Sequence, residues 1–166
     1  RWTKGAAPRH EHVLCKGDYE KTVPGETGRR WEINLSRRGL CFIVDDDVNQ
    51  SHIEVSNAAV LAGHWVHVVA VRDTKEKRLK LYIDGKRQGS TEPENPLFNG
   101  VDRTGDISNP RELVIGNSSH RDNAFHGELA EIRLYREALN EAQIAAVARL
   151  RRGAASNPAE TSLVKP

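Results

Sequence analysis

The chain has 166 residues and a mass of 18.5 kDa, a size at which one hydrophobic core is enough for one domain. Its 37% hydrophobic and 29% charged residues are typical of an ordinary globular protein and exclude wholesale disorder. The formal net charge of +2 is too small to indicate a nucleic-acid partner, and the longest central apolar run, Val68 to Val71, is far shorter than the roughly 20 residues that cross a bilayer. We therefore expect no nucleic-acid partner and no membrane insertion.

Short segments rich in β-branched and aromatic residues recur along the chain between turn signals. This spacing is typical of an all-β sandwich or barrel. We predict strands at Glu11–Lys16, Arg30–Ser36, Leu40–Asp45, Ser51–Val55, His64–Arg72, Lys77–Asp84, Arg87–Thr91, Glu112–Gly116 and Glu128–Tyr135.

The second of these segments alternates apolar and polar residues, as expected of a strand with one face toward a core. Trp31, Ile33 and Leu35 should point inward. Glu32 and Asn34 should then face outward from the sheet.

The segment Leu79–Ile83 repeats this alternation and ends in a hairpin signal. It leaves Lys80 and Tyr82 on its outward face, which predicts an antiparallel sheet with one wet side. Asp84-Gly85 follows, a dipeptide that favours a tight hairpin because both residues tolerate a positive φ. Between Thr91 and Pro110 the recurrence of Pro, Asn, Gly and Asp predicts a long surface loop.

One helix is predicted near the C-terminal end of the sequence. Asn140 followed by Gln143 has the form of a capping pair, and Ile144, Val147 and Leu150 recur at helical spacing. We expect this helix to lie against the edge of the sandwich. Residues 153–166 should form a linker or disordered tail, so that the domain covers residues 1–152.

The two cysteines, Cys15 and Cys41, fall on predicted strands that have another predicted strand between them. A disulfide does not join Cα atoms more than about 7 Å apart. Two half-buried thiols are therefore the favoured interpretation, and one disulfide stays the alternative.

Three stretches of the sequence, in one order, carry a resemblance to a known family. Gly63–Asp73 resembles a strand that contains a tryptophan, and Leu79–Lys86 resembles a strand with an aspartate-glycine turn. The third stretch runs from Leu113–Asn117 through Phe125–Tyr135 to the predicted helix. Over residues 2–150 the chain resembles the laminin-G-like jelly-roll domain of the concanavalin A-like lectin and glucanase superfamily.

The resemblance implies an all-β, two-sheet antiparallel jelly-roll sandwich with one short C-terminal helix. Such domains occur mostly in secreted or periplasmic proteins, often attached to glycoside hydrolases, sialidases, sulfatases or adhesins. The chain begins with Arg1-Trp2, without a hydrophobic leader, and we interpret it as a piece of a larger secreted protein. The partners we expect are an oligo- or polysaccharide and other domains of the parent protein.

The function that follows is a non-catalytic carbohydrate-binding or adhesion module. The alternative is a structural domain that packs against other domains or proteins without binding a glycan. A glycoside hydrolase is the least favoured interpretation, because Glu128 and Glu131 would face opposite sides of a strand, whereas retaining hydrolysis needs two carboxyl groups about 5 Å apart. The Glu-x-Asp-x-Glu arrangement of the glucanases is also missing.

Sugar binding requires aromatic faces and planar polar side chains that hydrogen-bond to hydroxyl groups. The outward positions of the predicted sheets supply several of these groups, unless they are plain solvated surface. Trp65 is expected in the core, because large aromatic side chains favour burial. The candidate ligand-binding residues are Glu32, Asn34, His52, Glu54, Lys80 and Tyr82.

An acidic turn follows the strand at Leu40–Asp45. Its carboxylate and amide oxygens are the ligands that calcium prefers, and the candidate ligands are Asp45, Asp47 and Asn49. Adjacent aspartate side chains on an extended chain diverge, so a solvated turn is the favoured interpretation. We expect no required cofactor and at most one calcium ion.

Overall fold

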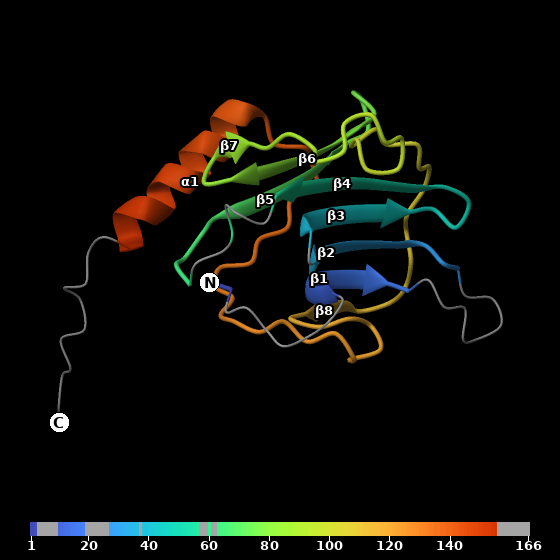
Figure 1. Ribbon diagram of the computed structural model, residues 1–166, viewed down its shortest axis with the longest axis horizontal. Coiled ribbons are helices and arrows are strands. Elements are labelled where there is room, and N and C mark those ends of the chain that lie inside the picture. Colours follow the sequence, from blue (N-terminus) through green and yellow to red (C-terminus); the bar gives the residue numbers. More distant parts are fainter. Residues whose placement is uncertain (3–9, 19–26, 37, 57–59, 61–62, 156–166) are drawn as a thin grey trace.

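The computed structural model describes residues 1–2, 10–18, 27–36, 38–56, 60 and 63–155, with the backbone alone for residues 151–155 (Figure 1). Within these residues the strands form two antiparallel sheets, with the orders β4-β3-β2-β1-β8 and β5-β6-β7. This arrangement confirms the expected two-sheet jelly-roll sandwich. The strands are β1 His10–Gly17, β2 Arg30–Ser36, β3 Gly39–Asp45, β4 Gln50–Ser56, β5 Val68–Asp73, β6 Arg78–Ile83, β7 Lys86–Arg87 and β8 Leu113–Ile115.

Strands β1 to β4 of the larger sheet follow one another in sequence and pair as neighbours. Each lies within one residue of its predicted bounds. The inward positions of β2 are Trp31, Ile33 and Leu35, as the alternation predicts, and all three belong to the core or pack against it. The outward positions are not wet, however, because Glu32 and Asn34 are both buried.

Strand β1 contains a bulge that the sequence pattern did not predict. His12 pairs with Asn34 and Leu14 pairs with Ile33, so Val13 is the extra residue. Val13 packs against the core. After the bulge, Cys15 pairs with Glu32 of β2 and so lies on the outward side of the sheet. The bulge therefore adjusts which side chains of β1 face outward.

The smaller sheet contains the predicted hairpin. Asp84 and Gly85 have φ angles of 52° and 78°, the positive values that favour Asp-Gly at this turn. The strand predicted at Arg87–Thr91 is shorter than expected, because β7 ends at Arg87. The strand predicted at His64–Arg72 begins only at Val68.

The hydrophobic core lies between the inner faces of the two sheets. The smaller sheet contributes the inward positions that the alternation predicts for β6. Buried core side chains from the two sheets are Leu35, Leu40, Phe42, Val44, Ile53, Val55, Leu79, Leu81 and Ile83.

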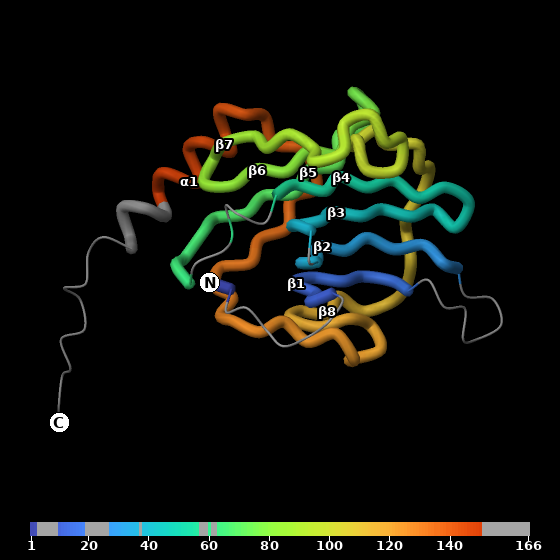
Figure 2. The backbone as a smooth tube through the Cα atoms, viewed as in Figure 1, coloured from blue at the N-terminus to red at the C-terminus, as the bar shows by residue number. Residues whose placement is uncertain are grey.

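The predicted long surface loop is tied to both sheets. Asn99 forms an isolated bridge with β4, and Val101 forms one with β6. Arg72 of β5 donates a hydrogen bond from Nε to Oδ2 of Asp102 at 2.7 Å. Figure 2 shows the segment between β7 and β8 running along one end of both sheets. The loop therefore joins the two sheets at their edges.

Helix α1, Glu141–Ala155, begins with the predicted capping pair. Asn140 Oδ1 accepts a hydrogen bond from the backbone N–H of Gln143, and Gln143 Oε1 accepts one from the backbone N–H of Asn140, both at 2.9 Å. Ile144 is completely buried and clusters with Val71 and Tyr82, on the outward face of the smaller sheet. The helix therefore covers a sheet face, as Figure 1 shows, and not only an edge.

The C-terminal end of the helix differs from the sequence pattern. Leu150 is 74% exposed, so the apolar stripe does not extend to it. The helix continues to Ala155, beyond the predicted domain end at residue 152. Residues 156–166 lie outside the described residues, and the linker assigned there stays a prediction. At 15 residues, this helix is too short to span a membrane.

The strand predicted at Glu128–Tyr135 is wrong. The segment has no ladder partner among the described residues, and Glu131 has a φ of 55°, a left-handed conformation that interrupts an extended strand. Trp65 is also 50% exposed, against its expected place in the core. The second sheet therefore keeps β5 as an edge strand among the described residues.

Cys15 and Cys41 are free, buried thiols. They lie on β1 and β3, with β2 between them. The interpretation as two apolar thiols is confirmed.

Replacing a core leucine should destabilise the domain strongly. Leu81 is fully buried between the sheets, so Leu81→Ala should lower the free energy of unfolding by about 2–5 kcal/mol through lost burial and a cavity. Urea denaturation followed by circular dichroism measures this change. Leu97→Ala is the matched control, because Leu97 is 55% exposed and its loss should cost about 0.5 kcal/mol or less. Equal losses in the two variants would contradict the placement of the core.

Candidate functional site

The outward face of the larger sheet gathers polar side chains from four strands, and we call it the polar face. Directly paired residues of neighbouring strands share a face, which places these side chains in rows. One row contains His12, Asn34, Cys41 and Glu54; another contains Cys15, Glu32, Ile43 and His52; a third contains Gly17, Arg30, Asp45 and Gln50.

Arg30 is the first residue of β2, in the end row of this face, and it is buried. Its Nη1 is 3.2 Å from Oδ2 of Asp45, and its Nε is 3.6 Å from Oε2 of Glu32. Both carboxylates come from the polar face itself. The guanidinium charge is therefore compensated by two carboxylates within the sheet.

Glu32 connects Arg30 to the β1 side of the face. His12 Nε2 lies 3.3 Å from Glu32 Oε2, and Asn34 Nδ2 donates to Glu32 Oε1 at 3.1 Å. Burial raises the pKa of Glu32, but the hydrogen bond from His12 and the nearby charges of His12 and Arg30 outweigh it. The pKa of Glu32 therefore lies below its ordinary value, and the carboxylate is ionised at neutral pH.

His52 occupies the β4 side of the face. Gln50 Nε2 donates to Asp45 Oδ2 at 2.9 Å, which leaves Gln50 Oε1 to accept a hydrogen bond from His52 Nε2 at 2.6 Å. The ring of Phe98 meets His52 edge-on, with centroids 5.1 Å apart. Burial, assisted by the charge of Arg30, lowers the pKa of His52 to about 4. His52 is therefore neutral at neutral pH.

Glu54 lies at the outer end of the same face. The hydroxyl groups of Ser36 and Thr91 are each 3.5 Å from its carboxylate. Burial raises the pKa of the neighbouring Cys41 thiol, and the negative charge of Glu54 adds to that rise. Cys41 is consequently an apolar neighbour and not a nucleophile.

Four buried polar atoms of the polar face form no hydrogen bond among the described residues. They are Nδ1 of His12, Oδ1 of Asn34, Nδ1 of His52 and Nε of Arg30, the last of which is held in the ion pair with Glu32. A buried polar atom without a partner costs about 1–3 kcal/mol. Each such atom needs an explanation, which is typically an ordered water or ion, strain or a functional role.

The structure separates the candidate ligand-binding residues into two groups. Four of the six, from β2 and β4, lie together on the polar face. Lys80 and Tyr82 lie on the outward face of the other sheet, where Lys80 pairs with Asp73 at 3.0 Å and Tyr82 packs under the helix. Sequence reasoning missed His12 and Arg30, although both lie at outward positions of predicted strands.

The candidate calcium ligands lie at the end of β3 and in the turn that follows it, where the backbone N–H of Asp47 donates to Asp45 Oδ1 at 2.8 Å. Asp45 pairs with Arg30, and Asp46 accepts hydrogen bonds from the backbone N–H groups of Val48, Asn49 and Gly105. Among the described residues, no group of three or more histidine, cysteine or acidic side chains is arranged for a metal. Calcium stays a prediction, without support from this geometry.

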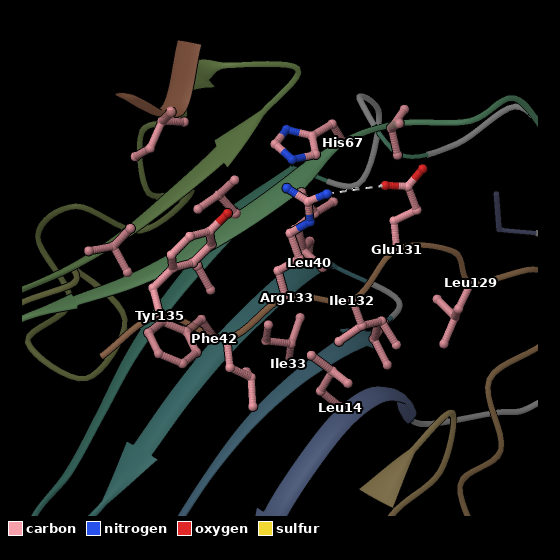
Figure 3. A pocket seen from close by; sticks show the side chains of 18 of the residues that line it. Leu14, Ile33, Leu40, Phe42, His67, Leu129, Glu131, Ile132, Arg133 and Tyr135 are labelled. Atoms are coloured by element: carbon pink, nitrogen blue, oxygen red, sulfur yellow. Dashed lines mark ion pairs between the residues drawn. The ribbon is translucent and has the colours of Figure 1, made fainter. Parts of the chain in front are cut away.

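An apolar cavity of about 430 Å³ opens between the sheets. Figure 3 shows Leu14 and Ile33 pointing from the larger sheet toward the segment that carries Ile132 and Arg133. The carboxylate of Glu131 is 3.9 Å from the guanidinium group of Arg133, whereas Glu128 pairs with Arg1 at 3.1 Å. The two glutamates that were weighed for hydrolysis therefore have separate arginine partners.

Comparisons with known proteins agree with the fold. A family model described as the concanavalin A-like lectin/glucanases superfamily matches residues 7–145. The CBM40 of the Ruminococcus gnavus IT-sialidase, bound to α2,3-sialyllactose, is similar in structure with a TM-score of 0.62 and 18% identity, covering 86% of this chain and 76% of that one. The same CBM40 bound to α2,6-sialyllactose gives a TM-score of 0.58 at 18% identity, covering 86% and 77%. No curated protein sequence matches this chain.

The neutral state of His52 should make stability depend on pH. Because the folded-state pKa is about 4, below the ordinary 6.5, the contribution of His52 is fully present above about pH 6.5 and is lost as the pH falls toward 4. Between about pH 7 and about pH 5 the free energy of unfolding should fall by roughly 1–2 kcal/mol from this group.

The variant His52→Gln should lose most of this pH dependence, as measured by urea denaturation at the two pH values. His64→Gln is the matched control, because His64 is exposed and lies outside the polar face. An unchanged slope of stability against pH in His52→Gln would contradict the assignment.

Proposed function

This chain belongs to the concanavalin A-like lectin and glucanase superfamily, as a laminin-G-like domain, and from that premise we propose that its polar face binds carbohydrate without catalysis. The domain would act as a carbohydrate-binding or adhesion module of a larger secreted protein. Its partners would be an oligo- or polysaccharide and the other domains of that protein.

The observation that supports the proposal is the incomplete hydrogen bonding of buried groups on the polar face. Asn34 is almost fully buried, yet its Oδ1 has no partner among the described residues. His12 and His52 each have a buried Nδ1 in the same condition. Sugar hydroxyl groups both donate and accept hydrogen bonds, which matches the mixture of donors and acceptors on this face.

The fold of the structural relatives also favours this function. The CBM40 structures are described as bound to sialyllactose, which is a property of that protein. A shared fold does not fix a ligand. The relatives therefore support a glycan as the class of ligand but not the identity of the sugar.

A second candidate function is packing against another domain or protein. Four large apolar side chains are substantially exposed along the cavity, and exposed apolar patches are typical of interaction surfaces. These residues are Trp65, Ile132, Leu134 and Tyr135. Absence of binding to every glycan tested would favour this function over sugar recognition.

Binding should depend on the carboxylates of the polar face. On a glycan array with neutral, sulfated and sialylated oligosaccharides, the purified domain should retain at least one ligand. Glu32→Gln and Glu54→Gln should each weaken binding of that ligand about tenfold or more, because a hydrogen bond to a charged group contributes about 1.5–3 kcal/mol. Isothermal titration calorimetry measures the affinities.

Glu141→Gln is the control for these variants. Glu141 is exposed at the start of α1, on the far side of the smaller sheet, and its change should leave the affinity unaltered. Thermal melting of each variant separates loss of binding from loss of folding. Full affinity in both polar-face variants would contradict the proposal.

A further inference from the structure

Strand β5 has a free edge. It ends the order β5-β6-β7, so β6 is its one neighbour among the described residues. The backbone N–H of Asp84 donates to the carbonyl oxygen of His67 at 2.8 Å, in the register that the ladder continues along β5. Because alternate residues of an antiparallel strand turn their N–H and C=O groups to opposite sides, Val68, Ala70 and Arg72 present theirs at the free edge. No backbone hydrogen bond to another described residue satisfies these groups.

The apolar cavity reaches round this edge. Its lining includes Val68 and Ala70, which pack on the core side of β5, and also Val69 and Val71, which pack on the side of the helix. Side chains from both faces of one strand border a single space only where that space passes the edge of the strand. Figure 3 shows Ile33 of the larger sheet on the opposite wall. The free edge and the cavity are therefore one surface.

The sequence leaves this edge unprotected. Natural edge strands are usually blocked by a charge, a proline or a covering segment. From Val68 to Val71 the strand has neither a charge nor a proline, and residues 128–135 form no ladder with it. The left-handed conformation of Glu131 interrupts that segment, so it does not supply an extended strand at this edge.

An occupant of this surface has to satisfy a row of polar backbone groups and fill an apolar space. A lipid or another small apolar molecule would fill the cavity and leave the edge unpaired. An added β-strand does both, because its main chain pairs with the edge while every second side chain points into the space. The geometry therefore favours a polypeptide in an extended conformation.

The charges around the opening indicate what such a polypeptide carries. Arg133 lies 3.9 Å from Glu131, and Arg72 donates to Asp102 at 2.7 Å, so these charges are already compensated within the chain. A charged side chain that entered the apolar cavity would lose its water without such compensation. The paired stretch of the occupant should therefore be uncharged.

We propose that the free edge of β5 and the cavity beside it bind an extended segment of another polypeptide by β-strand addition. The segment carries apolar residues at every second position and no charge over the stretch that pairs. This interaction goes beyond sugar binding at the polar face and does not depend on it. It gives a specific form to packing of the domain against a partner protein.

The first test uses synthetic peptides and the whole chain. Fluorescently labelled nine-residue peptides have valine, isoleucine or leucine at every second position and threonine between. One control has the same composition with the apolar residues in one block, and the other is N-methylated at alternate amides. Fluorescence anisotropy should show binding of the alternating peptides, and both controls should bind about tenfold more weakly or less, because they lose the pairing or the matching side chains.

A proline variant tests the edge itself. Ala70→Pro removes an N–H that points away from β6, so the ladder with β6 stays intact while peptide affinity should fall about tenfold or more. Arg87→Pro is the matched control on the opposite edge of the same sheet. Gln88 donates its backbone N–H to Leu81, so the N–H of Arg87 points away from β6, and this variant should keep full peptide affinity. Thermal melting checks the folding of both variants.

Hydrogen exchange gives a readout that needs no variant. The amides of Val68, Ala70 and Arg72 should exchange rapidly in the free chain and become protected when the alternating peptide is added. Slow exchange in the free chain would overturn the proposal, because another part of the chain or a second copy would already cover the edge. Light scattering then distinguishes these two occupants.

The remaining outcomes keep this proposal apart from glycan binding. Binding of no alternating peptide, equal binding of the N-methylated control, or full peptide affinity in a folded Ala70→Pro variant would overturn strand addition. Ala70 lies outside the polar face, so glycan affinity should be unaltered in that variant. Loss of either activity alone therefore leaves the other standing.

Discussion

The burial of Arg30 constrains the larger sheet more than any other single interaction. A guanidinium group removed from water must be paired, and breaking a buried pair typically costs about 3–5 kcal/mol. Here the two partners come from β2 itself and from β3, because Asp45 is the directly paired neighbour of Arg30. A slip of β3 by one residue along β2 would point Asp45 into the apolar core. Arg30 would then lose its ion pair with Asp45. The ion pairs and the hydrophobic alternation therefore favour the same register.

The polar face follows from this register. Glu32 and Asp45 pair with Arg30, and the neighbouring Asn34 and Gln50 donate hydrogen bonds to these two carboxylates. Asn34 donates to Glu32, and His52 donates to Gln50. Oδ1 of Asn34 and Nδ1 of His52 form no hydrogen bond among the described residues. The ion pairs that hold the sheet therefore also fix the hydrogen bonding of the polar face.

Sequence reasoning succeeded where a local pattern has one structural solution. Alternation at Trp31–Leu35 gives a strand with a defined core face, and Asp84-Gly85 gives a hairpin, because few conformations satisfy either pattern. It failed at Glu128–Tyr135, where similar alternation is interrupted by the left-handed conformation of Glu131. Alternation states which side chains share a face of a strand, but it does not state whether that strand acquires a partner.

The candidate site was predictable only in part, for a related reason. Alternation placed Glu32 and Lys80 correctly as outward residues, but it did not show that they belong to different sheets. Their burial was also beyond the sequence pattern, because it accompanies ion pairs with Arg30 and Asp73 that alternation does not show. The bulge at Val13 in β1 has a faint sequence signal, two consecutive apolar residues that both need a place inside.

The central claim, that a glycan binds the polar face, is tested most directly by nuclear magnetic resonance. The domain labelled with nitrogen-15 would be titrated with the oligosaccharide that it retains most strongly on an array. The account predicts chemical-shift changes at the side-chain amides of Asn34 and Gln50 and at the imidazole of His52, with little change at the Trp65 indole. Changes confined to Trp65 and residues 128–135 would contradict it and would place the ligand at the apolar cavity.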